Sequence, residues 1–230
     1  SKQVSAEEII AIEDLVNTQI EKNSKSVTEV MTIEQATKKG AIAFFGEKYG
    51  EQVRVLDLGE GFSVELCGGT HVKTTGEIGL MKIISESGIS AGVRRIEAVT
   101  GIGAALLLQE LEQNITSICD ELLVDLKPID KDKNNLELIR DFQSQLNLLA
   151  RELNTPENQI LKRIIVMKEE ITSLQNVLGS NTEIKTSSGS VIDAIKELKS
   201  LSKSLKNKTK KKKQNLYNTL QPQTIKKIRH

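Results

Sequence analysis

Residues 53–71 read VRVLDLGEGFSVELCGGTH, and this stretch decides the fold of the N-terminal part of the chain. Two runs rich in β-forming residues, Val53–Leu58 and Phe62–Leu66, flank the glycine-rich segment Leu58-Gly59-Glu60-Gly61. Short strand-like runs on either side of a glycine-containing turn are typical of a β-hairpin. The stretch therefore predicts two antiparallel strands that lead directly into Cys67.

The pentapeptide that follows the second strand, Cys67-Gly68-Gly69-Thr70-His71, places a thiol and an imidazole four residues apart. Thiolate and imidazole are the ligands that zinc prefers. A helix would place both on one face, but each glycine costs about 1 kcal/mol in a helix interior. A tight loop is the better prediction, with Cys67 and His71 as candidate metal ligands.

A zinc site needs about four ligands, or three and a water molecule. The chain contains only two cysteines and two histidines, and Cys119 and His230 lie far from the pentapeptide in the sequence. Either carboxylates complete the site, or its other half lies outside this chain, and we favour the second alternative.

Outward from this stretch, the N-terminal residues predict two helices that begin with capping boxes. Ser5 with Glu8 and Thr32 with Gln35 have the spacing of an N-cap and an N3 partner, and Gly40 suits the residue after a helix. Two further strands are predicted at residues 79–86 and 93–100. Helices combined with antiparallel strands indicate an α+β layer.

After Gly101 the hydrophobic residues follow helical spacing, in narrow stripes close to those of a coiled coil. Residues 104–206 are predicted to form a helical arm, broken near residues 128–135 and 179–189, with Cys119 as a core thiol. Thr155 and Pro156 predict the start of one helix, and Ser190 opens a last short one. The stripe residues are Leu107, Leu111, Ile115, Ile118, Leu122, Leu126, Leu136, Ile139, Phe142, Leu146, Leu149, Leu153, Ile160, Ile164, Met167, Ile171, Leu174, Leu178, Val191, Ile195, Leu198 and Leu205.

Composition limits the class of protein. Hydrophobic residues make up 38% of the 230 residues, there is no tryptophan, and no apolar run approaches 18 residues, so no transmembrane helix is expected. The first residues lack a signal-peptide pattern, and two cysteines of unlike context do not form a disulfide framework. A reducing, cytoplasmic location fits these features.

Charge is distributed unevenly along the chain. From Lys203 onward there are ten basic residues and no acidic one. Since the whole chain has a net charge of +1, the first 202 residues have a net charge of −9. The run Lys210–Lys213 predicts a solvated, disordered tail, and phosphate contact is the alternative. A third alternative is a gene that has drifted out of frame near its end.

The run from Ser63 to Val72 resembles the second-half motif of the editing domain of the alanyl-tRNA synthetase family. Four flanking strings occur in the family's order: GAIAFFGEKYG at 40–50, VRV at 53–55, TGEIG at 75–79 and GVRRIEAVTG at 92–101. The resemblance covers roughly residues 5–101, and the related editing domain of threonyl-tRNA synthetases has a similar layout. It implies part of the second additional domain that these two families share.

The resemblance implies hydrolysis of the ester in mischarged Ser-tRNA(Ala) and Gly-tRNA(Ala). In this family a zinc ion is held by an upstream His-x3-His motif together with the Cys and His of Cys-x3-His. No histidine precedes His71 here, so the remaining ligands are expected upstream of residue 1. Zinc would polarise the ester carbonyl, activate water, or orient the aminoacyl group, and the sequence does not choose among these roles.

Further residues receive roles from this resemblance. Gly68 and Gly69 are expected to allow close approach of the tRNA(Ala) 3′ end, and Thr70 to hydrogen-bond in the pocket or serve as an ordinary loop residue. Arg94 and Arg95 are neighbours on a strand, so at most one of them faces the site, and Arg94 is the candidate.

The predicted organisation has three parts: 1–101 as the C-terminal half of an editing domain, 102–206 as a helical dimerisation arm and 207–230 as a basic tail. ATP and alanine sites of the family's ligase activity are absent from these residues, so the chain is expected to be an internal piece of such an enzyme. The alternatives are a degenerate gene product without catalysis and a helical scaffold that forms a homodimer.

Overall fold

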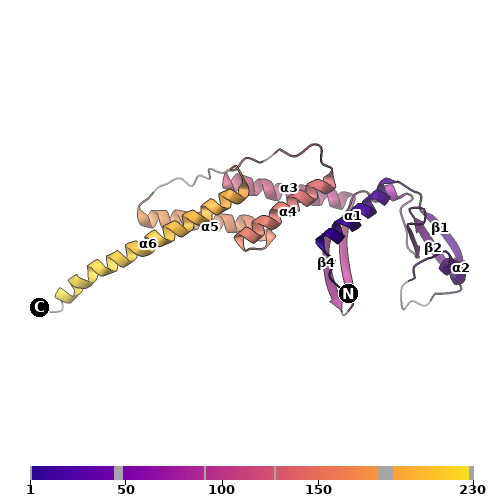
Figure 1. Ribbon diagram of the computed structural model, residues 1–230, viewed down its shortest axis with the longest axis horizontal. Coiled ribbons are helices and arrows are strands. Elements are labelled where there is room, and N and C mark those ends of the chain that lie inside the picture. Colours follow the sequence, from indigo (N-terminus) through magenta and orange to yellow (C-terminus); the bar gives the residue numbers. More distant parts are fainter. Residues whose placement is uncertain (1, 44–48, 91, 127, 181–188, 228–230) are drawn as a thin grey trace. The chain divides into compact units, whose positions relative to one another are not determined.

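The computed structural model describes residues 2–43, 49–90, 92–126, 128–180 and 189–227 (Figure 1). The chain forms two compact units, Ser1–Leu107 and Leu108–His230. Part of the 40–50 string, residues 44–48, lies outside the described residues. None of the described helices is both long and apolar enough to cross a bilayer.

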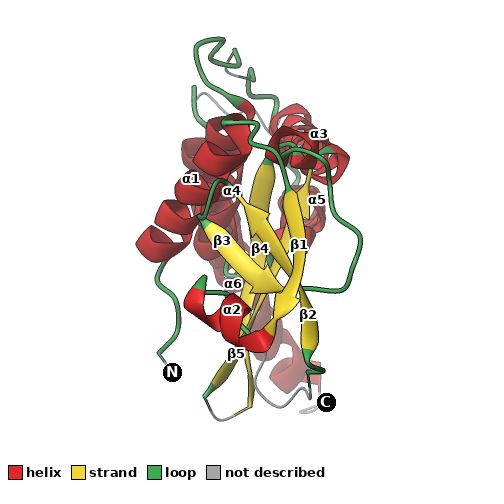
Figure 2. Cartoon of the chain, turned by 90° about the vertical axis from the view of Figure 1, so that its right-hand side faces the viewer, coloured by secondary structure: helices red, strands yellow, loops and turns green. Residues whose placement is uncertain are grey.

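The first unit contains one three-stranded antiparallel sheet in the order β1-β2-β3, formed by β1 (Val27–Thr32), β2 (Gln52–Leu58) and β3 (Ser63–Leu66). The predicted hairpin is confirmed, and Leu58 pairs with Ser63 across its turn. Helix α2 (Ile33–Lys38) contacts β1 and β2 (Figure 2). Four buried residues form the core between α2 and the sheet: Ala36, Val53, Val55 and Leu66.

A separate antiparallel hairpin is formed by β4 (Met81–Ser90) and β5 (Val93–Thr100). Helix α1 (Ala6–Glu21) packs against β4 through Ile20, and a short 3-10 helix, η1 (Thr75–Ile78), precedes this strand. The two predicted hairpin strands are confirmed, but β4 extends to Ser90 and leaves a shorter connection than expected. The fold of this unit is therefore α+β, as the sequence predicts.

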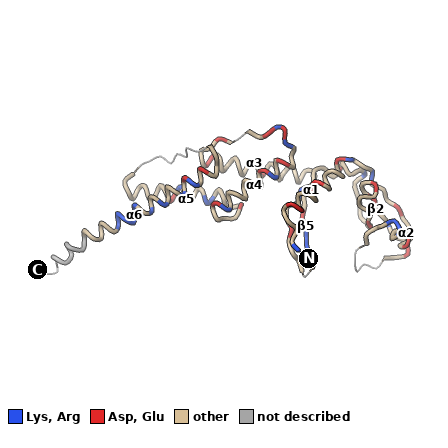
Figure 3. Tube along the Cα trace, viewed as in Figure 1, with Lys and Arg blue, Asp and Glu red and all other residues tan. Residues whose placement is uncertain are grey.

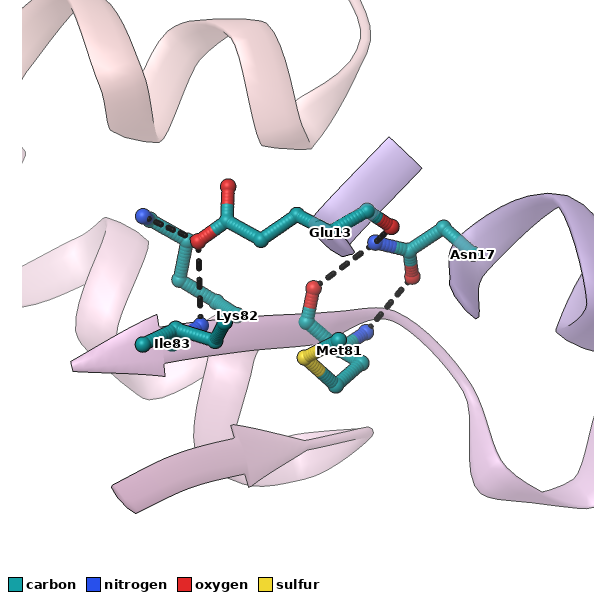
Figure 4. A network of polar contacts seen from close by, with 5 residues as sticks. All are labelled: Glu13, Asn17, Met81, Lys82 and Ile83. Atoms are coloured by element: carbon teal, nitrogen blue, oxygen red, sulfur yellow. Dashed lines mark hydrogen bonds and ion pairs between the residues drawn. The ribbon is translucent and has the colours of Figure 1, made fainter. Parts of the chain in front are cut away.

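Side chains of α1 bind the backbone along one edge of β4 (Figure 4). The amide of Asn17 donates to the carbonyl of Met81 at 2.8 Å and accepts from its N–H at 2.8 Å. The Glu13 carboxylate accepts from the backbone N–H of Ile83 at 3.1 Å and from the Lys82 ammonium at 2.6 Å. Because β5 pairs with the other edge, both edges of β4 are hydrogen-bonded at its start, from Met81 to Ile83.

The second unit is helical and consists of most of α3 (Ile102–Leu122), α4 (Asn135–Leu153), α5 (Ile160–Leu178) and α6 (Val191–Lys227). The ion pair between Lys206 and Glu170 and the hydrogen bond from Lys212 to the carbonyl of Val177 show that α5 and α6 run parallel. Most residues of the predicted stripes are buried, and so is Cys119, the expected core thiol. The stripes of α5 and α6 are covered within one chain, so a dimer formed by this arm would use other surfaces.

Two expectations for the second unit differ from the structure. Helix α6 has 37 residues, where the sequence predicted a short helix and then a disordered tail from residue 207. Contacts with α5 support the extension, because Thr209 is buried and Lys212 is bound to the α5 backbone. In addition, α5 does not begin at Pro156: a 3-10 turn, Glu157–Gln159, precedes its first residue, Ile160.

Candidate functional site

The predicted metal ligands come together in the loop that follows β3. The backbone N–H of Cys67 donates to the carbonyl of Arg54 at 3.1 Å, which extends the β2–β3 ladder by one bond. Beyond this point the loop turns, and the Nε2 atom of His71 lies 3.2 Å from the Sγ atom of Cys67. Cys67 is half-buried and His71 is exposed, so the pair is anchored in the sheet and open on one side.

This separation fits two ligands of a single zinc ion. With Zn–S of about 2.3 Å and Zn–N of about 2.0–2.1 Å, donors at two corners of a tetrahedron lie roughly 3.5 Å apart. The observed 3.2 Å requires only a small opening of the loop. Within the described residues no group of three or more His, Cys, Asp or Glu side chains is placed to hold a metal. The loop therefore presents two donors that fit zinc and leaves the others to be supplied.

Arg54 holds the loop from the neighbouring strand. Its guanidinium donates to the carbonyl of Cys67 at 2.9 Å and also to the carbonyl of Gly69. Two carbonyls bound by one planar cation fix the turn that brings His71 back toward Cys67. The sequence motifs by themselves give Arg54 no role, although a signal for one is present. Once Leu58 pairs with Ser63, counting along both strands places Arg54 directly opposite Cys67.

The far end of the loop is anchored to the first helix and its following turn. The carbonyl of Lys73 accepts from Ser26 N–H at 2.9 Å. The Thr75 hydroxyl donates to the carbonyl of Gln19 at 2.9 Å and accepts from Ser24 N–H at 3.0 Å. With Arg54 at one end and these bonds at the other, the donor pair belongs to a loop that is fixed at both ends.

The two glycines of the pentapeptide provide space, and the backbone does not require them. Neither Gly68 nor Gly69 has a positive φ, so any residue could adopt these conformations. A Cβ atom at position 69 would lie 3.7 Å from Cys67 Sγ and 3.9 Å from His71 Nε2, in contact with both donors. Gly68, Gly69 and Thr70 are all exposed. The missing side chain at Gly69 therefore leaves both donor atoms accessible to a ligand.

Arg94, the remaining predicted site residue, lies on β5 and pairs with a carboxylate of its own hairpin. Its guanidinium donates to both oxygens of Glu86, with Nη2 to Oε2 at 2.7 Å, and the Glu86 side chain is almost completely buried. Arg95 points elsewhere and approaches Glu97 at 3.8 Å. The structure thus brings Cys67, Gly68, Gly69, Thr70 and His71 together in one loop and places Arg94 in a separate ion pair on the hairpin.

This ion pair predicts acid sensitivity of the hairpin. Hydrogen bonds from Arg94 hold the pKa of Glu86 below its ordinary value of 4.5. A carboxylate whose pKa is lowered by folding stabilises the fold at any pH above its ordinary pKa. This stabilisation is lost as the pH falls through the pKa of the folded state. We expect Glu86→Gln to be less stable than the parent at pH 7, and the free energies of unfolding of the two proteins to become equal in acid. The measurement is unfolding at a series of pH values from 7 downward. Glu97→Gln removes the same charge at an exposed and longer pair and should lower the stability at pH 7 much less. An equal loss in the two variants would contradict this assignment.

Comparison with known proteins identifies the family. Residues 53–97 match the family model described as threonyl and alanyl tRNA synthetase second additional domain. The chain is 46% identical over 175 residues to an alanine–tRNA ligase of Coxiella burnetii (strain Dugway 5J108-111), covering 76% of this chain and 20% of that protein. It is 40% identical over 217 residues to an alanine–tRNA ligase of Psychrobacter cryohalolentis, covering 90% of this chain and 23% of that protein. The chain spans about a fifth of the length of these relatives. On these matches, the chain belongs to the alanyl-tRNA synthetase family.

Proposed function

We propose that this chain supplies half of a zinc-dependent editing site that hydrolyses Ser-tRNA(Ala) and Gly-tRNA(Ala) in the cytoplasm. The observation that carries the proposal is the convergence of Cys67 Sγ and His71 Nε2 to 3.2 Å in a loop fixed at both ends. The whole protein would attach alanine to tRNA(Ala); its relatives are named alanine–tRNA ligases.

An enzyme that charges tRNA with alanine needs such a site for a physical reason. A pocket shaped for alanine cannot exclude the smaller glycine by size, and it rejects one additional hydroxyl by only about 10². Discrimination must therefore continue after charging, at a second site that cleaves the wrong ester.

Each residue of the loop has a role in this proposal. Cys67 and His71 would hold the ion, with further ligands from sequence upstream of residue 1. Zinc bound there would supply a positive charge that polarises an ester carbonyl or lowers the pKa of water. Arg54 keeps the two donors in place through the carbonyls of Cys67 and Gly69. The space beside Gly69 would admit the 3′ end of the tRNA.

The reaction is an ester hydrolysis. The oxygen of water forms a bond with the carbonyl carbon of the aminoacyl group, and the bond from that carbon to the ribose oxygen breaks. A proton passes to the ribose oxygen, so the products are a free amino acid and a tRNA with its terminal hydroxyl restored. No oxidant or further reactant is needed.

The proposal is tested on the natural polypeptide that carries residues 53–101, purified from its own cells and measured for intact mass, zinc content and deacylation. We expect bound zinc and hydrolysis of Ser-tRNA(Ala), little hydrolysis of Ala-tRNA(Ala), and loss of hydrolysis after chelation with recovery on addition of zinc. Persistent hydrolysis in the fully metal-free protein would reject the zinc site. A protein that retains zinc but cleaves neither mischarged tRNA would reject the editing function.

A further inference from the structure

Helix α6 carries a lysine stripe beside the apolar stripe that it buries. The buried residues Ile195, Leu198, Ser202, Leu205 and Thr209 are spaced alternately by three and four residues. Six lysines repeat the same spacing one position later and lie on one flank of the helix, a surface that we call the lysine ridge: Lys196, Lys199, Lys203, Lys206, Lys210 and Lys213. All six are exposed. Lysine and arginine positions recur along the trace of α6 in Figure 3.

Acidic residues neutralise only part of this ridge. Lys199 pairs with Glu152 at 2.6 Å and Lys206 with Glu170 at 2.9 Å, which fixes two ammonium groups against the other helices. Lys203, Lys210 and Lys213 have no carboxylate partner among the side chains that the structure describes. Glu197 is the last acidic residue of the sequence, so no later residue offsets their charge.

The length and regularity of the ridge match a polyanion. From Lys196 to Lys213 the helix rises by about 26 Å, at 1.5 Å per residue. A nucleic acid presents phosphates at short, regular intervals, and lysines that neutralise them release counterions, which is the main source of sequence-independent affinity. Lysines that are already held in a row on a helix release counterions on binding without the entropy cost of ordering a flexible tail.

The same surface lacks what a membrane would require. A helix that lies on a bilayer buries an apolar face below its basic residues. Between Lys203 and Lys213 the only apolar residue is Leu205, and it is already buried in the helical unit. Along Lys203–Lys213 a lipid surface would therefore contact charge alone, and the next exposed apolar side chains of the helix are Leu216 and Tyr217.

We propose that the lysine ridge of α6 binds the phosphate backbone of RNA without reading its sequence. This interaction is separate from the metal-binding loop, because it uses the helical unit alone and requires neither zinc nor ester hydrolysis. It would add affinity for any RNA that reaches the helix, tRNA included.

The test compares two double variants that remove equal charge from the same helix. Lys203→Gln with Lys210→Gln removes two cations of the ridge. The matched control, Lys208→Gln with Lys211→Gln, removes two exposed lysines that lie away from the ridge at 100° per residue. Lys212 is kept, because it donates to the Val177 carbonyl of α5. Binding of tRNA, and of an unrelated duplex RNA of similar length, is measured from 50 to 200 mM salt. Circular dichroism confirms equal helix content.

For the ridge variant we expect the slope of log affinity against log salt to fall by about 2, with about tenfold lower affinity at low salt, on both RNAs. The control should keep most of the parent slope. Equal losses in the two variants would overturn the proposal, because net charge would then explain the binding. Unchanged binding in both, or binding of anionic-lipid vesicles in place of RNA, would also overturn it.

Discussion

Replacing Cys67 with alanine is expected to lower zinc affinity by at least about 100-fold and to reduce hydrolysis of Ser-tRNA(Ala) to background. Changes in groups that only support a ligand already cost 10–100-fold in metal affinity, and this change removes a ligand. His71, which faces Cys67 at 3.2 Å, would remain as a single exposed imidazole. The measurement is zinc stoichiometry by mass spectrometry of the native protein, with single-turnover deacylation of the same samples.

The second cysteine offers a matched control. Cys119 is buried in α3, with 3% of its surface exposed, and desolvation raises the pKa of its thiol, so it is a poor source of thiolate. We expect Cys119→Ala to lower stability slightly and to leave zinc content and deacylation unchanged. If Cys67→Ala retained its zinc, or if both variants lost it equally, Cys67 would not be a ligand.

Local signals predicted much of the first unit correctly. The capping boxes at Ser5 and Thr32 are present, and Gly40 has the positive φ expected of a residue that follows a helix. The glycine-rich turn fixed the pairing of β2 with β3. These features depend on residues close together in the sequence, which is why the pattern alone sufficed.

Long-range and exposed features escaped prediction. Strand β1 is an edge strand whose residues are mostly exposed, so it lacks the alternation of apolar and polar residues that marks a strand. Its partner, β2, lies some twenty residues later in the sequence. The sequence does not predict the extension of α6 either. Its composition alone indicates disorder, and the segment is supported by contacts with α5.

The candidate site also contains some features that the sequence predicts and others that it does not. Cys67 and His71 were recognisable because two unusual ligand types stand close together, and the hairpin places them in one loop. The sequence does not predict the pairing of Arg94 with Glu86. It gives the faces of a strand but not the register of β4 on β5, which contains two irregularities. The 3.2 Å approach of the two donors likewise depends on Arg54, a residue of the adjacent strand.

Breaking the buried ion pair between helix α1 and strand β4 is the stability change with the largest expected effect. The side chains of Glu13 and Lys82 are 0% and 7% exposed, and the carboxylate also holds Ile83 N–H. Lys82→Met would leave that carboxylate buried without its cation, at a cost of about 3–5 kcal/mol. Hydrogen exchange at the Met81 and Ile83 amides, bound by Asn17 and Glu13, reports the loss locally.

The double variant Glu13→Leu with Lys82→Met decides how this pair acts. Replacing both charges by apolar groups of similar size removes two desolvation penalties, so we expect most of the lost stability to return. The recovery should be incomplete, because Ile83 N–H would lose its acceptor while Asn17 keeps both bonds to Met81. A double variant as unstable as Lys82→Met would show that the charges themselves attach α1 to β4. Full recovery would show that the two hydrogen bonds of Asn17 suffice.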